Sequence, residues 1–137
     1  MTEREFHTPM VAVVDDDTAF IELLCELLAD EGMQVSCYIN SADAFRDLRS
    51  LQPDLIVLDV RLEKPEAGWQ LLEMLRIDRA TAQIPVILCS ADSHFLRERV
   101  DLLRAHNAEP LEKPFSIDEL LDKIWMVLDS PPLVKAR

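Results

Sequence analysis

The sequence contains no long hydrophobic run, no closely spaced cysteine pair and no excess of basic residues. No membrane span is predicted, because that would need about 20 consecutive apolar residues, and the first ten residues lack the apolar segment of a secretion signal. Cys25, Cys37 and Cys89 are far apart and odd in number, so we expect three reduced core thiols, neither a zinc site nor a disulfide framework. The expected location is the cytoplasm.

Acidic residues outnumber basic ones by 26 to 14, which gives a formal net charge of −12. A surface this negative repels nucleic-acid backbones and anionic lipids, so we expect neither nucleic-acid nor membrane binding. Divalent cations and proteins with a basic face are the better candidate partners. The 137 residues, 49% of them hydrophobic, are typical of one globular domain.

Short apolar runs alternate with segments of helical periodicity along the chain. Strands are predicted at 10–14, 33–38, 55–58, 85–89 and 108–112, and a helix is predicted after each. This alternation predicts an α/β fold, a doubly wound (βα)5 domain with a five-stranded parallel sheet. Pro110 has no amide hydrogen to donate, so the fifth strand belongs at an edge of the sheet. We place the domain at residues 10–128, between an N-terminal extension (1–9) and a C-terminal tail (129–137).

Polar side chains gather where the predicted strands end. Asp15 and Asp16 follow the first strand, Asp59 the third, Ser90 the fourth and Lys113 the fifth. Ligands of open α/β sheets bind at the carboxyl ends of the strands, so these side chains should meet at one rim.

Crowded carboxylates repel one another, and a divalent ion relieves that repulsion. Mg²⁺ prefers oxygen ligands, usually a few carboxylates together with water. A carboxylate in such a cluster can accept a phosphoryl group, because phosphoryl transfer depends mostly on positioning and charge neutralisation. Lys113 would add positive charge and Ser90 a hydrogen bond.

The segments VVDDD, LIVLDV, VILCSA and LEKPF, in this order and spacing, resemble the receiver domain of two-component response regulators over residues 10–128. The resemblance implies a flavodoxin-like strand order, 2-1-3-4-5; receiver domains are among the folds from which the rule on strand ends was drawn. It also implies that Asp59 accepts the phosphoryl group, with Ser90 and Lys113 assisting. Asp15, Asp16, Asp59 and the carbonyl of Arg61 would then bind Mg²⁺.

By the same resemblance, the phosphoryl donor is a histidine kinase or a phosphotransfer protein. The chain should act as a single-domain regulator whose output is protein contact, through the face formed by the fourth helix, fifth strand and fifth helix; a homodimer also fits. It is expected to be no enzyme beyond its own phosphorylation and slow dephosphorylation.

Two features depart from the common family pattern, and a third feature bears on how long the phosphoryl group survives. Pro110 stands where the family usually has a switch residue with a mobile side chain, so we expect signalling to use the loop after Ser90 and the fourth helix instead. The loop RLEKPEAG after Asp59 is one residue longer than usual. Arg61 and Asp92 carry opposite charges that could pair over the site and slow hydrolysis of the phosphoryl group.

Two other functions stay open. A Mg²⁺-dependent phosphatase with an aspartate nucleophile is disfavoured, because Arg61 stands two positions after Asp59 where an acid would be needed. A phosphorylation-independent interaction module would be favoured if the acceptor, the acidic pair or the lysine were missing, and all are present. Individually, Asp15 to Asp17 could simply cap a helix, and Lys113 could belong to an ordinary loop.

Overall fold

The computed structural model describes residues 8–129, in which five strands alternate with six helices, two of them consecutive. The elements are β1 (Met10–Val14), α1 (Thr18–Asp30), β2 (Gln34–Tyr38), α2 (Ser41–Leu51), β3 (Leu55–Asp59), α3 (Ala67–Ile77), β4 (Val86–Ser90), α4 (Ser93–Glu98), α5 (Val100–Ala105), β5 (Ala108–Glu112) and α6 (Ile117–Asp129). The predicted extension (1–9) and tail (129–137) lie almost entirely outside the described residues, so these two boundaries stay predictions.

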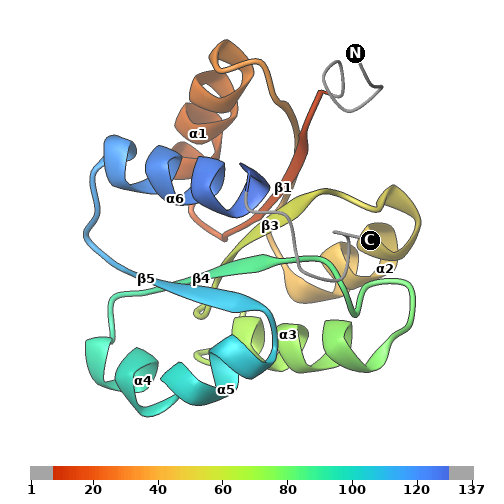
Figure 1. The fold of residues 1–137 in the computed structure, drawn as a ribbon, viewed down its shortest axis with the longest axis vertical. Helices are drawn as coiled ribbons and strands as arrows, with labels where there is room; N and C mark the ends of the chain where they lie inside the picture. The colour runs from red at the N-terminus through yellow and green to blue at the C-terminus, as the bar shows by residue number, and fades with distance from the viewer. Residues whose placement is uncertain (1–7, 130–137) are drawn as a thin grey trace.

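The five strands form one parallel sheet in the order β2-β1-β3-β4-β5 (Figure 1). Both the predicted fold and the predicted strand order are confirmed. The fifth strand, which contains Pro110, is at an edge as predicted, because the missing amide hydrogen disturbs only the unpaired side of an edge strand. The order reverses at β1 and β3, so their carboxyl ends flank the crevice of the sheet.

Helices cover both faces of the sheet, α1 and α6 on one and α2 to α5 on the other (Figure 1). Successive strand side chains point to opposite faces, so Val11 and Val13 pack under α1 and α6, whereas Ala12 and Val14 pack under the other helices. All five residues of β3 are buried, which explains its run of hydrophobic residues.

Short polar side chains fix the beginnings of several helices. Asp17 accepts a hydrogen bond from the amide of Phe20 at the start of α1. Ser116 and Glu119 form the predicted capping box of α6, each side chain accepting from the other residue's amide at 3.0 Å. These caps set where the loops at the carboxyl edge of the sheet end.

The single fourth helix predicted from the sequence is wrong in one respect, because it is broken at Arg99 into α4 and α5. The amide of Arg99 donates to the carbonyl of Leu96, one residue short of the α-helical partner. The carbonyl of Phe95 instead accepts a hydrogen bond from Nη1 of the Arg99 side chain, at 3.3 Å. A side chain has therefore replaced a backbone donor in the helical ladder. The predicted fifth helix is α6 in the structure.

Cys25 and Cys37 are not separate core thiols as expected, because the structure brings their sulfur atoms together as a disulfide pair, although their Cα atoms lie 7.8 Å apart, wider than a disulfide normally spans. Cys25 is on α1 and Cys37 on β2, two elements that pack together, so the fold brings the side chains into contact. Their separation of 12 residues gave no sign of this contact. Cys89 is free and buried in β4.

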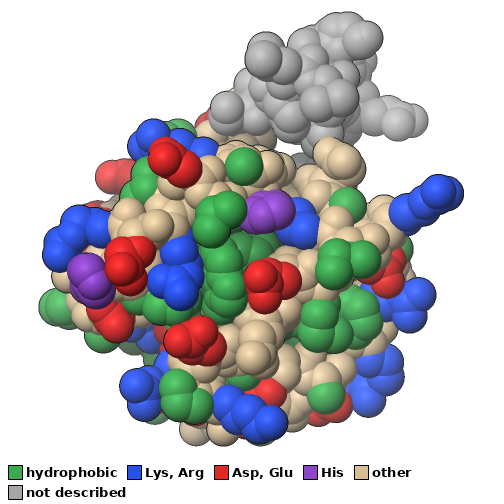
Figure 2. All heavy atoms as spheres, turned by 90° about the horizontal axis from the view of Figure 1, so that it is seen from below, with side chains coloured by type: hydrophobic (Ala, Val, Ile, Leu, Met, Phe, Trp, Pro, Cys, Tyr) green, Lys and Arg blue, Asp and Glu red, His purple; other side chains and the backbone are tan. Residues whose placement is uncertain are grey.

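Across residues 8–129, no helix combines the length and the hydrophobicity that crossing a membrane requires. The face that carries α3, α4 and α5 shows acidic, basic and hydrophobic side chains interspersed, without a large patch of one kind (Figure 2).

Candidate functional site

Three of the predicted carboxylates meet at the carboxyl edge of the sheet. Asp15 and Asp16 follow β1, and Asp59 is the last residue of the neighbouring strand β3. One carboxylate oxygen from each lies within 4.8 Å of the others. Asp15 and Asp59 are buried, with 4% and 8% of their surface exposed, whereas Asp16 is open to solvent. The strand register therefore assembles the acidic cluster that the sequence predicted.

Lys113 lies against this cluster as predicted. Its Nζ atom is 3.2 Å from Oδ1 of Asp59 and 3.4 Å from Oδ2 of Asp15. Its amide donates to the carbonyl of Ser90 at 2.8 Å, which ties the end of β5 to the end of β4. The ammonium group also lies 5.6 Å from the ring centroid of Phe20, a favourable cation–π distance that the sequence analysis missed.

The charges of the cluster are only partly compensated. Burial raises the pKa of Asp59 to about 6; Lys113 opposes this shift, and the negative charges of Asp15 and Asp16 add to it. Burial alone would lower the pKa of Lys113, but the neighbouring charges of Asp59 and Asp15 outweigh burial and the pKa is raised. The ammonium group therefore stays charged, while the Asp59 carboxylate lacks part of the positive charge that it needs.

Ser90 has its hydroxyl group at the same edge. Its Oγ atom accepts a hydrogen bond from the amide of Asp92 at 3.0 Å, so the hydroxyl hydrogen remains available to donate. Ala91 follows with a side chain of one methyl group and also lines the cleft, so little bulk stands beside the hydroxyl. Ser90 is thus placed to donate to an anionic group bound next to Asp59.

Gly68, in the first turn of α3, allows the helix to approach the end of β3. A Cβ atom there would lie 1.8 Å from the carbonyl oxygen of Asp59, far inside contact distance. The amide of Gly68 donates to the carbonyl of Val60 at 2.8 Å. Only glycine permits this approach, a role that the loop sequence alone did not reveal.

These groups open onto a cleft of about 430 Å³ between β3, β4 and the loops that follow them. Asp59, Ser90, Lys113 and the predicted carbonyl ligand Arg61 all line it, together with Phe95. The predicted pairing of Arg61 with Asp92 is wrong: among the described side chains no ion pair joins them, and Asp92 Oδ1 accepts from the amide of Phe95. The prediction that this pair slows hydrolysis therefore loses its basis.

The loop after Asp59 is anchored at two points. Leu62 is buried in the core, with 4% of its surface exposed. Glu63 accepts hydrogen bonds from the amide and the hydroxyl group of Ser41, the first residue of α2. The loop is therefore held beside the cleft at both points.

Two other polar groups near the cleft have structural roles. Asp17 caps α1, as its alternative interpretation proposed. Cys89 is the register partner of Asp59 in the sheet, but burial raises the pKa of its thiol to about 12, which leaves it protonated and poorly nucleophilic.

The donor set suits a hard divalent cation. Three carboxylates converge here, and one of them, Asp16, is open to solvent. The exposed side leaves room for the water molecules that Mg²⁺ usually keeps. A cation here would also offset the repulsion that raises the pKa of Asp59. The residues therefore fit Mg²⁺, with an adjoining cleft large enough for a phosphoryl group.

The family model described as "Response regulator receiver domain" matches residues 11–125. Protein PetR of Rhodobacter capsulatus is 37% identical over 124 residues, which are 90% of this chain and 50% of that protein. The chain spans about half the length of the curated relatives it matches.

Solved structures agree with the fold. The HemR receiver domain of Leptospira biflexa is 27% identical with a TM-score of 0.79, covering 91% of this chain and 98% of that one. The receiver domain of sensor histidine kinase PA1611 of Pseudomonas aeruginosa, 22% identical, has a TM-score of 0.76 and covers 90% of this chain and 100% of that one. That structure has a magnesium ion coordinated in its active site cleft.

Proposed function

Because the chain belongs to the family of response regulator receiver domains, we propose that Asp59 accepts a phosphoryl group from a histidine kinase or a phosphotransfer protein. The observation that carries the proposal is the Asp59 carboxylate at the wall of the cleft, beside two further carboxylates and 3.2 Å from Nζ of Lys113. Receiver domains are signalling domains, so the expected chemistry is a single phosphorylation followed by slow loss of the phosphoryl group.

Mg²⁺ would be held by Asp15, Asp16 and Asp59, with the backbone carbonyl of Arg61 as a further ligand. When bound, it would neutralise charge on the oxygens of the transferred group. Lys113 would hold the same oxygens from the other side, because its ammonium group already lies within 3.4 Å of two carboxylates. Ser90 would donate its free hydroxyl hydrogen.

The transfer forms a bond between phosphorus and a carboxylate oxygen of Asp59, and it breaks the bond between phosphorus and a nitrogen of the donor histidine. The imidazole leaves with the bonding electrons and takes up a proton. Asp59 must be ionised to attack, so neutral or higher pH favours the reaction. Placement of the acceptor oxygen, rather than acid–base catalysis, is the main contribution of the protein.

The output is protein contact in the cytoplasm, through the α4–β5–α6 face or through a homodimer. The net charge of −12 supports partners with basic surfaces over nucleic acid or membranes. The chemistry of the site is the same whichever kinase, target and pathway use the module, so the surfaces of the partners decide that choice.

Acetyl phosphate with Mg²⁺ tests the proposal directly. Intact-mass spectrometry should show a gain of one phosphoryl group, which chelation of Mg²⁺ prevents. Asp59→Asn should abolish the gain, whereas Asp17→Asn, which removes a charge from the same edge but keeps the helix cap, should preserve it. Absence of labelling would instead favour the phosphorylation-independent module, and many turnovers of a small phosphomonoester would favour the phosphatase.

A further inference from the structure

A chain of hydrogen bonds connects the phosphoryl-binding cleft to α4. Oγ of Ser90 accepts from the amide of Asp92, and Oδ1 of Asp92 accepts from the amide of Phe95, each at 3.0 Å. The first turn of α4 is therefore connected, through Asp92, to the hydroxyl group that faces the cleft. The hydroxyl group is thus one hydrogen bond away from Asp92, the residue that caps the helix.

The side chain of Phe95 continues this connection outward. Its ring lines the cleft and meets the ring of Trp69 on α3 edge-on, with 5.9 Å between the centroids. The guanidinium carbon of Arg99 lies 3.7 Å from the Phe95 ring centroid and 5.3 Å from that of Trp69. Arg99 thus bridges two aromatic rings, one at the cleft and one on a neighbouring helix.

Arg99 also occupies the position where the helix is broken. Its Nη1 atom holds the Phe95 carbonyl that a continuous helix would pair with the Arg99 amide. The Arg99 amide donates to the Leu96 carbonyl instead, so a continuous helix would require the Phe95 carbonyl to exchange its side-chain donor for the Arg99 amide. A switching element needs two discrete arrangements of this kind.

On the β5 side of the cleft, the side chain that could change conformation is more restricted. Pro110 in β5 has a side chain closed into a ring, and its carbonyl accepts from Nζ of Lys123 on α6 at 3.3 Å. A change in the cleft is therefore more easily passed to α4 than to β5.

We propose that Phe95, Arg99 and Trp69 form the relay that converts phosphorylation of Asp59 into a changed surface at α3 and α4. The relay rests on the proposed function. A phosphoryl oxygen that accepts from Ser90 draws Oγ toward Asp59, and the Asp92 amide and the Phe95 amide follow. The stack of Arg99 over the two rings is thereby rearranged. The surface offered to a partner thereby changes at α4, the helix that also belongs to the proposed α4–β5–α6 face.

Trp69 is a built-in reporter for this relay. Trp125 is the other tryptophan of the chain, so Trp125→Phe leaves the emission of Trp69 alone. Beryllofluoride with Mg²⁺ serves as the phosphoryl stand-in, and its binding is followed independently by ¹⁹F NMR. We expect the Trp69 emission to change with the same saturation curve as the NMR signal.

Arg99→Lys keeps the charge but loses the planar group that stacks on both rings. We expect it to abolish the Trp69 response and to change the apparent beryllofluoride affinity about fivefold, the lower end of usual coupling between two sites. Arg97→Lys is the matched control, because Arg97 is exposed on α4, and its variant should keep the full response.

Saturated binding without a change in Trp69 emission would overturn the relay and leave the proposed function intact. Equal loss of the response in the Arg97→Lys and Arg99→Lys variants would overturn it as well. Absence of beryllofluoride binding would overturn the proposed function and the relay together.

Discussion

Replacing Asp59 with asparagine should stabilise the folded protein while abolishing phosphorylation. The pKa of Asp59 is raised from 3.8 to about 6, so its ionised form is disfavoured in the folded state by about two pKa units. At 1.36 kcal/mol per unit, the ionised side chain costs about 3 kcal/mol at pH 7.5. The side chain is only 10% exposed, so solvent screening reduces this figure little.

The direction in which stability changes with pH follows from the number of protons bound by the folded and the unfolded protein. Between pH 3.8 and about 6 the folded protein keeps the Asp59 proton that the unfolded chain has lost, so wild-type stability falls as the pH rises through this window. Asparagine resembles the neutral acid and does not titrate. The advantage of Asp59→Asn should therefore be about 3 kcal/mol above pH 6 and should vanish below about pH 3.8.

Urea denaturation followed by circular dichroism, at pH 7.5 and at pH 4 with a chelator present, measures both values. Asp17→Asn is the control for the loss of one charge from an acidic protein, and we expect it to change the free energy of unfolding by less than about 0.5 kcal/mol. Mg²⁺ at 100 times its dissociation constant should add about 2.7 kcal/mol to the wild type and much less to Asp59→Asn. An Asp59→Asn variant less stable than wild type at pH 7.5 would refute the reasoning.

Three further variants test separate contacts. Gly68→Ala should destabilise the fold by at least about 2 kcal/mol, because its Cβ atom would meet the acceptor strand at 1.8 Å; Gly32→Ala, with open space but a φ of +85°, should cost only about 1 kcal/mol in the same denaturation assay. Arg76→Met should cost about 2–4 kcal/mol, because four backbone carbonyls lose their charged donor. Glu63→Ala should weaken Mg²⁺ binding about two- to fivefold in calorimetry, since a carboxylate at a helix N-terminus contributes ~0.3–1 kcal/mol to holding the loop after β3; an equal effect of Glu73→Ala, on the exposed face of α3, would contradict this.

The sequence predicted the features that follow from the order of the strands and helices along the chain. Alternating apolar and amphipathic segments predict a parallel sheet, and a parallel sheet brings all strand ends to one edge. Asp15, Asp59 and Lys113 therefore converge although up to 98 residues separate them. Pro110 likewise marked the edge strand, because a missing amide hydrogen is a local property.

The sequence did not predict what depends on side-chain packing between elements. The contact of Cys25 with Cys37 requires the distance between α1 and β2, and the break at Arg99 requires knowing that its side chain reaches Phe95. The close approach at Gly68 depends on a backbone distance that no residue type encodes. In each case the deciding quantity is three-dimensional.

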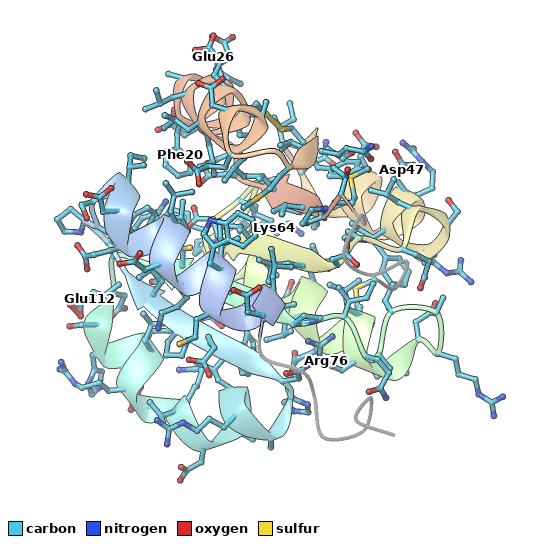
Figure 3. All side chains as sticks on the ribbon, turned by 45° about the horizontal axis from the view of Figure 1, so that its top comes forward. Phe20, Glu26, Asp47, Lys64, Arg76 and Glu112 are labelled. Atoms are coloured by element: carbon cyan, nitrogen blue, oxygen red, sulfur yellow. A yellow bond between two sulfur atoms is a disulfide. The ribbon has the colours of Figure 1, made fainter. Side chains whose placement is uncertain are left out.

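Two charges, the half-buried Arg76 and the buried Asp59, differ in how the fold satisfies them. Arg76, at the end of α3 (Figure 3), is buried deeply enough to lower its pKa to about 10, and among the described residues no carboxylate forms an ion pair with it. It is nevertheless satisfied, because it donates to four backbone carbonyls near the start of β4 and β5.

Asp59 lies at the other end of the strands and is not satisfied to the same degree. It shares the single ammonium group of Lys113 with Asp15, and its pKa rises as a result of burial and repulsion. If further hydrogen-bond donors surrounded the Asp59 carboxylate, as carbonyl acceptors surround Arg76, its charge would already be compensated. A bound cation would then add little stabilisation. The deficit of positive charge at this edge is therefore what suits the cleft to the proposed binding of a cation and a phosphoryl group.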